Sequence, residues 1–212
     1  MHLPDGFLSP PVWASLDALA LVTVAGCTAA LQRQDLPEET VPRMGMLGAF
    51  VFAAQMVNVP VGAGTSGHLL GGVLVASLVG PYAATLVMAA VFLLQCLLFQ
   101  DGGILALGAN VINMGLSGTL GGYLLLRVLL RWSPSRDLAV FLAAWLSVVG
   151  SSALVSVELA LSGAAPLTLS LVAMVGVHAL IGLVEGSITL AVVRFVARVR
   201  PETLTGTPLE AV

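Results

Sequence analysis

The feature that most constrains this chain is its long stretches without ionised side chains. Residues 44 to 99 contain no Asp, Glu, Lys or Arg, and His68 is the only basic residue among them. Charged residues make up 9% of the chain and hydrophobic residues 58%, whereas soluble domains have about 25% charged residues. Apolar stretches of this length can cross the hydrocarbon core of a bilayer. The sequence therefore predicts an all-α integral membrane protein.

Charges and turn residues divide the chain into about seven candidate transmembrane helices. The third is short for a full span, so we expect one short or broken helix near residues 60–80. Non-helical backbone is tolerated at membrane depth where it lines a protein cavity, so the glycine-rich segment VPVGAGTSGH at 59–68 is a first indication of a site. The predicted spans are 11–32, 44–60, 67–80, 82–99, 106–130, 138–162 and 168–197.

The arginines predict the orientation of these spans. All basic residues other than histidine are arginines, and the positive-inside rule places them in the cytoplasm. The N-terminus is then outside and the C-terminus cytoplasmic, in the cytoplasmic (inner) membrane of a bacterium or archaeon. Three unusual segments meet on the outer face: MHLPDG at 1–6, VGAGTSGH at 61–68 and DGG at 101–103. The arginines are Arg33, Arg43, Arg127, Arg131, Arg136, Arg194, Arg198 and Arg200.

The N-terminal residues Met1 and His2 have the chemistry of a metal chelate. No basic n-region precedes the turn PDG at 4–6, so we expect the mature chain to keep Met1. An unblocked amine, the residue-2 amide nitrogen and the Nδ1 of His2 can bind one metal through two chelate rings. Planar nitrogen sites favour Ni(II) or Cu(II) over Zn(II), and His68 offers a fourth nitrogen. The alternative is a frayed end at His2 and a packing histidine at His68.

Polar residues inside the predicted spans are further candidates. A carboxylate at the centre of a span costs on the order of 3 kcal/mol on insertion scales, so Glu158 and Glu185 should face the interior with a partner. His178 lies two helical turns before Glu185 on one helix face. These residues either support a metal site or ion path, or join helices by hydrogen bonds. The same alternatives apply to Asn58, Asn110 and Asn113, whereas packing is the interpretation for the cysteines Cys27 and Cys96.

A second constellation favours an enzyme. GTSG at 64–67 contains Ser66, and HALIG at 178–182 places His178 on a later helix. This is the outline of a rhomboid-like intramembrane serine protease, in which a histidine activates a buried serine. That hypothesis leaves MHLPDG and His68 without a role.

Several long motifs, in order, closely resemble one family. Through most of residues 1 to 190 the chain resembles the CbiM/NikM family, the cobalt/nickel-binding S-component of energy-coupling-factor (ECF) type ABC transporters. The motifs are MHLPDGFL, VPVGAGTSGHLLGG, LVGP, LLQCLLFQDGGILALGANVINMG and MVGVHALIGLVEGSIT.

The resemblance implies a seven-helix subunit that binds Ni(II) or Co(II) from outside with high affinity. Residues 1–212 would be a single transmembrane substrate-binding domain, with 1–10 as a metal-binding segment folded into the bundle. The implied ligands are the amine of Met1, the amide and imidazole of His2, and His68. The resemblance places a further set of residues around the site: Asn58, Ser66, Asn110, Asn113, His178 and Glu185. It also implies that Ala49 and Ala53 contact a helix of a partner subunit.

The resemblance also implies the partners. These are a transmembrane coupling subunit (EcfT/CbiQ/NikQ-like), cytoplasmic ATPase subunits (CbiO/NikO-like) and a small accessory membrane subunit. The lipid bilayer surrounds the chain, and no nucleic acid is expected as a partner. The chain has no GxxxxGK[ST] motif, so we expect no ATP site and no catalysis in this subunit. A standalone metal permease is the alternative within transport.

Overall fold

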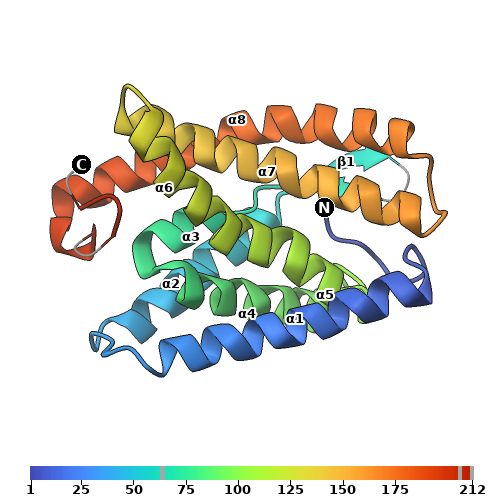
Figure 1. The fold of residues 1–212 in the computed structure, drawn as a ribbon, viewed down its shortest axis with the longest axis horizontal. Coiled ribbons are helices and arrows are strands. Elements are labelled where there is room, and N and C mark those ends of the chain that lie inside the picture. The colour runs from blue at the N-terminus through green and yellow to red at the C-terminus, as the bar shows by residue number, and fades with distance from the viewer. Residues whose placement is uncertain (63–64, 205–206, 211–212) are drawn as a thin grey trace.

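The computed structural model describes residues 1–62, 65–204 and 207–210. It is a bundle of helices with one short β-hairpin (Figure 1). The helices lie where hydropathy predicted the spans, so the mostly helical fold class is confirmed. The elements are α1 (Pro10–Leu31), α2 (Thr40–Gln55), β1 (Val59–Gly62), β2 (Thr65–Gly67), α3 (Gly72–Val79), α4 (Pro81–Phe99), α5 (Leu107–Asn110), η1 (Val111–Gly121), α6 (Gly122–Trp132), α7 (Arg136–Leu161), α8 (Leu167–Val199) and η2 (Pro201–Leu204).

The glycine-rich segment corrects the all-α prediction. It forms the antiparallel pair β1–β2, in which Val59 lies opposite Gly67. The chain then continues without helix to Gly71, where a φ of +81° begins the turn into α3. α3 spans Gly72–Val79 and is the short helix expected near residues 60–80.

The helix ends follow local chemistry. α1 and α4 each begin with proline, at Pro10 and Pro81, where the missing N–H costs nothing because the first turn has no partner for it. α7 begins after Ser135, whose hydroxyl accepts the N–H of Leu138 at 3.2 Å. These signals explain why the observed boundaries lie close to the predicted ones.

The short helix α3 forms the centre of the bundle. Its residues from Gly72 to Leu78 are all buried, and α3 contacts α2, α4, η1, α6, α7 and α8. Gly72 crosses Gly118 so closely that a Cβ at position 72 would lie 2.6 Å from the Gly118 carbonyl carbon. Two glycines therefore set the depth at which α3 packs.

The fifth predicted span is not one regular α-helix. Its middle, η1, is a π-helix over Val111–Gly121. Inside it the Ser117 hydroxyl donates to the Asn113 carbonyl, and the Thr119 hydroxyl donates to the Gly115 carbonyl at 2.6 Å. Hydroxyls that compete for helix carbonyls loosen the α-helical ladder, and π-helical turns often occur at functional sites.

The outer surface is apolar, as a bilayer requires. Four helices, α1, α4, α7 and α8, are long and apolar enough to cross a membrane. In α1 only Ala20 and Cys27 are buried, while Leu21 is 72% exposed. A helix that is apolar all round and mostly exposed is a membrane span. Cys27 and Cys96 are both buried and unbridged, as the packing interpretation predicted.

The glycine crossing generates the first prediction. Gly72→Ala should lower the free energy of unfolding by about 1–3 kcal/mol, the usual cost of overpacking, because the new Cβ meets backbone that cannot rotate away. Gly176→Ala in α8 is the matched control, since a Cβ there meets nothing within 4 Å. Thermal unfolding of both variants in detergent measures the difference. Equal melting temperatures would show that the crossing is not tight.

Candidate metal centre

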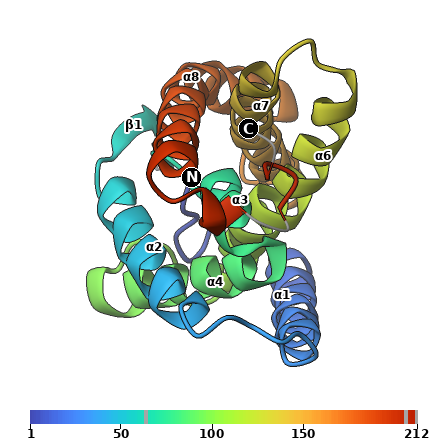
Figure 2. The ribbon, with the colours of Figure 1, turned by 90° about the vertical axis from the view of Figure 1, so that its left-hand side faces the viewer.

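The first three residues lie inside the bundle. Met1 and Leu3 are fully buried and His2 is 3% exposed, and Figure 2 shows the N-terminus within the ring of helices. Asn110 binds both main-chain groups of Leu3: the Leu3 N–H donates to Asn110 Oδ1 at 2.8 Å, and Asn110 Nδ2 donates to the Leu3 carbonyl at 3.2 Å. Buried non-helical backbone needs such partners, so Asn110 anchors the N-terminal segment.

Asp5 joins this segment to the loop after α4. Its carboxylate accepts the N–H groups of Ile104 at 3.2 Å and Leu105 at 2.8 Å, and the Gly103 N–H donates to the Leu3 carbonyl at 2.9 Å. A Cβ at position 103 would lie 2.1 Å from Asp5 Oδ1, so only glycine fits there. MHLPDG and DGG therefore pack against each other, as predicted.

The His2 imidazole has neighbours from several parts of the chain, among them the Gln95 side chain of α4. The imidazole stacks on the ring of His68, with centroids 4.6 Å apart and planes 20° from parallel. The ring of Phe92 meets it edge-on at 5.5 Å, and Asp101 Oδ1 lies 3.3 Å from His2 Nδ1. The third outer segment, which ends at His68, thus meets the other two.

Burial keeps the N-terminal donors unprotonated. It lowers the pKa of the Met1 amine to about 5, although the Asp101 carboxylate acts in the opposite direction. It also lowers the pKa of His2, again against Asp101. At neutral pH both groups carry lone pairs, which is the form that binds a metal. The pKa of Asp101 is itself lowered, chiefly by its hydrogen bond with His2 and to a smaller extent by Asn58.

His68 presents one nitrogen to the same place. Its Nδ1 lies 2.7 Å from the Leu69 carbonyl, which can only accept, so Nδ1 carries the proton. Nε2 then holds a lone pair, and it is buried with no hydrogen-bond partner among the residues that the structure describes. A histidine whose other nitrogen is fixed by a carbonyl is typical of metal ligands.

His178 of α8 has the same arrangement. Its Nδ1 donates to the Met174 carbonyl at 2.7 Å, and its Nε2 is buried without a partner in the described parts of the chain. A Cβ at position 67 would lie 3.5 Å from His178 Nε2 and 2.5 Å from Ile181 Cδ1. Gly67 therefore lets the hairpin pack directly on α8, next to His68.

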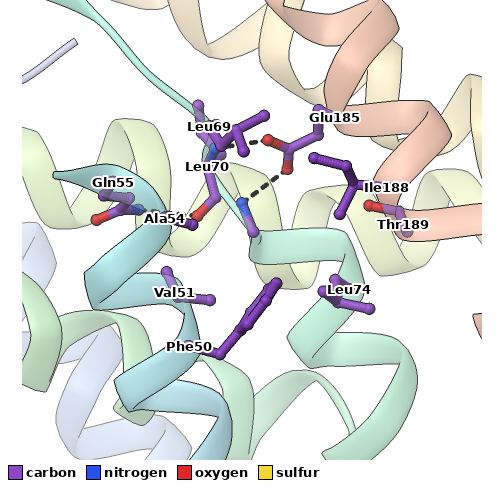
Figure 3. A pocket seen from close by; sticks show the side chains of 11 residues that line it. Phe50, Val51, Ala54, Gln55, Leu69, Leu70, Leu74, Glu185, Ile188 and Thr189 are labelled. Atoms are coloured by element: carbon purple, nitrogen blue, oxygen red, sulfur yellow. Dashed lines mark hydrogen bonds between the residues drawn. The ribbon is translucent and has the colours of Figure 1, made fainter. Parts of the chain in front are cut away.

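Two side chains, Glu185 and Gln55, hold the backbone after His68 (Figure 3). Glu185 accepts the N–H groups of Leu70 at 2.6 Å and Gly71 at 2.7 Å. Gln55 donates to the Leu70 carbonyl at 2.8 Å and accepts from Gln95 at 2.9 Å. The sequence analysis missed both glutamines, although amide side chains inside an uncharged apolar run were a visible signal.

The predicted interior carboxylates both have partners. Glu185 binds the backbone as just described, and Glu158 of α7 accepts from Asn113 Nδ2 at 2.6 Å. Asn113 and Asn110 therefore have different roles, although they lie three residues apart. Asn110 holds the N-terminal segment and Asn113 joins η1 to α7.

The remaining predicted residues lie at the edge of this centre or outside it. Asn58 is exposed and interacts with Asp101. Ala49 and Ala53 are exposed on α2. The side chain of Ser66 lies outside the described residues.

Side chains alone do not complete a metal site here. The described residues contain no group of three or more His, Cys, Asp or Glu arranged to hold a metal ion. The donors that do gather are two imidazoles and the main-chain nitrogens of the N-terminus.

Comparison with known proteins gives a consistent picture. Residues 2–203 match the CbiM family, described as the cobalt uptake substrate-specific transmembrane region. A putative fused nickel transport protein NikMN of Archaeoglobus fulgidus is 39% identical over 96% of this chain and 68% of its own length. A putative fused cobalt transport protein CbiMQ of Methanocorpusculum labreanum is 32% identical over 95% of this chain, which covers 36% of that protein.

A solved structure shares the fold. The crystal structure of a truncated transition metal transporter superposes with a TM-score of 0.87 at 31% identity, over 93% of this chain and 99% of that chain. The sequence comparison and the structure comparison therefore both find metal transport proteins.

Asn110 provides a test of how the N-terminus is held. Asn110→Ala should increase amide hydrogen exchange of residues 2–5, because both hydrogen bonds to Leu3 are lost at about 1 kcal/mol each. Asn113→Ala is the control, since it removes a buried amide that binds Glu158 instead. Mass spectrometry of exchanged peptides measures the effect. Equal protection of residues 2–5 in both variants would contradict the anchoring role.

Proposed function

The chain belongs to the CbiM family of metal uptake proteins, and we propose that it is the subunit that captures Ni(II) or Co(II) outside the membrane for import. One observation carries this proposal. The N-terminus is buried, and His2 lies against His68, whose Nδ1 is fixed by a carbonyl so that its Nε2 has a lone pair. Nickel and cobalt are the metals in the names of the relatives.

The proposed ligands are four nitrogens. The Met1 amine, the His2 amide and the His2 Nδ1 form two fused chelate rings, and His68 Nε2 closes the plane. The absence of a side-chain metal cluster among the described residues supports this set, because it leaves backbone donors as the remaining source. A planar nitrogen set is well suited to Ni(II).

Binding requires a small movement of His2. A planar site needs both rings edge-on to one metal, whereas the His2 and His68 rings are now stacked. We propose that the His2 ring turns out of the stack and that its proton moves from Nδ1 to Nε2, so that Nδ1 leaves Asp101 for the metal. The His2 amide nitrogen releases its proton to solvent as the metal binds. Asp101 then remains beside the N-terminus as a counter-charge. Asn110 and Asp5 hold residues 3–5 during this change.

The wider arrangement follows the family. We propose seven spans with the N-terminus outside, supported by the helix positions and by the arginines, which lie toward helix ends and in the connections between helices. We propose that energy comes from partner ATPases through a coupling subunit; the name of the CbiMQ relative describes a CbiM part fused to a CbiQ part in that protein. The exposed Ala49 and Ala53 give α2 a flat face for that partner.

The N-terminal chelate is tested by extending the chain. The purified protein with its native N-terminus should bind about one Ni(II) or Co(II), and two extra residues before Met1 should weaken binding by more than about 100-fold, beyond the cost of losing a single outer-shell partner. The extension converts the Met1 amine into an amide and displaces residues 1 and 2, which are buried. Two residues are added because a single one would place the histidine third in the chain, where the amine, two amides and the imidazole form a nickel chelate of their own. Isothermal titration with Ni(II) measures this.

Two controls sharpen that experiment. One extra residue after Val212 should leave the affinity unchanged, and Ser66→Ala should do so as well. Equal binding by the N-terminally extended protein would overturn the chelate. Peptide cleavage that Ser66→Ala abolishes would favour the protease alternative instead.

Dependence on partners is tested by uptake in cells. The chain expressed alone should give no uptake of radioactive nickel above background, whereas co-expression with a coupling subunit and ATPases of this family should restore it, because the chain has no nucleotide-binding motif. An ATPase variant without its catalytic carboxylate is the control. Full uptake by the chain alone would identify a standalone permease.

A further inference from the structure

After His68, two successive peptide groups each form hydrogen bonds through both their carbonyl oxygen and their N–H. The peptide group between Leu69 and Leu70 accepts from His68 Nδ1 at its carbonyl and donates to Glu185 at its N–H. The next peptide group, between Leu70 and Gly71, accepts from Gln55 and donates to the second oxygen of Glu185. Resting on the function proposed above, we propose that Glu185 is a positioning residue that aims His68 at the metal through these peptide groups.

The first step is the rigidity of the peptide group. A trans peptide is planar, with its C=O and N–H pointing in opposite directions, and the described chain contains no cis peptide bond. Once Glu185 fixes the direction of the Leu70 N–H, the direction of the Leu69 carbonyl is fixed as well. That carbonyl sets both the tautomer and the rotation of the His68 ring. The carboxylate thus acts on His68 although it does not touch the ring.

The second step is the need for a carboxylate. Leu70 and Gly71 donate to different oxygens of Glu185, at 2.6 and 2.7 Å. A glutamine offers one acceptor oxygen, and its NH₂ group would face the second N–H. A buried donor left without a partner is unfavourable, so one of the two peptide groups would rotate. Position 185 therefore requires two acceptors on one side chain.

The third step is the opposite side of the loop. Gln55 of α2 binds the Leu70 carbonyl and is itself bound by Gln95 of α4. Both glutamines are fully buried. The peptide groups are therefore held between α8 on one side and α2 with α4 on the other (Figure 3). A loop held in this way keeps the His68 nitrogen in place before the metal arrives, which strengthens binding.

The test is a double-mutant cycle between Glu185 and His68. Glu185→Gln should weaken Ni(II) binding about 10–100-fold, as the loss of an outer-shell partner does. Combined with His68→Ala, it should change the remaining affinity of the N-terminal chelate by no more than about twofold, because sites that act through one ligand are not additive. The change in melting temperature that Glu185→Gln causes should be the same in the wild-type protein and in the His68→Ala variant.

Glu158→Gln is the matched control. It alters another buried carboxylate, which binds Asn113 rather than the loop, and should change affinity by no more than about twofold. Gln55→Met is a second variant in case Glu185→Gln does not fold. It releases the Leu70 carbonyl from the other side and should also weaken binding only when His68 is present.

The outcomes are distinct. Unchanged affinity in Glu185→Gln would overturn the inference, and so would an equal loss with and without His68. Failure of the wild-type protein to bind Ni(II) or Co(II) would instead overturn the proposed function. The positioning role would be established by three results together. Glu185→Gln weakens Ni(II) binding, Glu158→Gln does not, and Glu185→Gln causes no further loss of affinity in the His68→Ala variant.

Discussion

The arrangement depends on one constraint: backbone that is buried in a membrane protein without being helical must find hydrogen-bond partners within the protein. Two stretches of this chain are of that kind, the N-terminal segment and the chain between β2 and α3. The first is held by Asn110, Asp5 and Gly103. The second is held by Glu185 and Gln55. Each stretch carries one histidine, and their anchors bring the two imidazoles together.

Several polar side chains of the interior therefore form hydrogen bonds with buried main-chain groups. A buried amide or carboxylate is unfavourable in an apolar bundle unless it is satisfied, and Asn110, Gln55 and Glu185 are each satisfied by main-chain groups. The nitrogens of His68 and His178 that lack partners in the described chain stand out against this pattern. The lone pairs of these two ring nitrogens are available for a ligand.

Much of this could be predicted from the sequence. Hydropathy is a local property, so the helix positions were predictable, and the turn and glycine signals indicated the non-helical segments. Met1, His2 and His68 could be grouped because histidines are rare in this chain and because chelate chemistry requires His at position 2. The hairpin β1–β2, the π-helix η1 and the pairing of Gln55 with Gln95 were not predicted. They depend on how helices rotate against one another, which no short stretch of sequence specifies. Asn110 and Asn113 illustrate this, since a difference of three residues sends one to the N-terminus and the other to Glu158.

The two anchored stretches hold their histidines by different kinds of contact, and this difference suits the proposed capture of a metal. His68 lies on backbone fixed at successive peptide groups by side chains from α2 and α8. His2 is held by ring contacts with His68 and Phe92 and by polar contacts with Asp101 and Gln95. Ring contacts allow rotation more readily than paired hydrogen bonds do. In the proposed function, the backbone after His68 defines where the metal binds, and the His2 ring turns toward it.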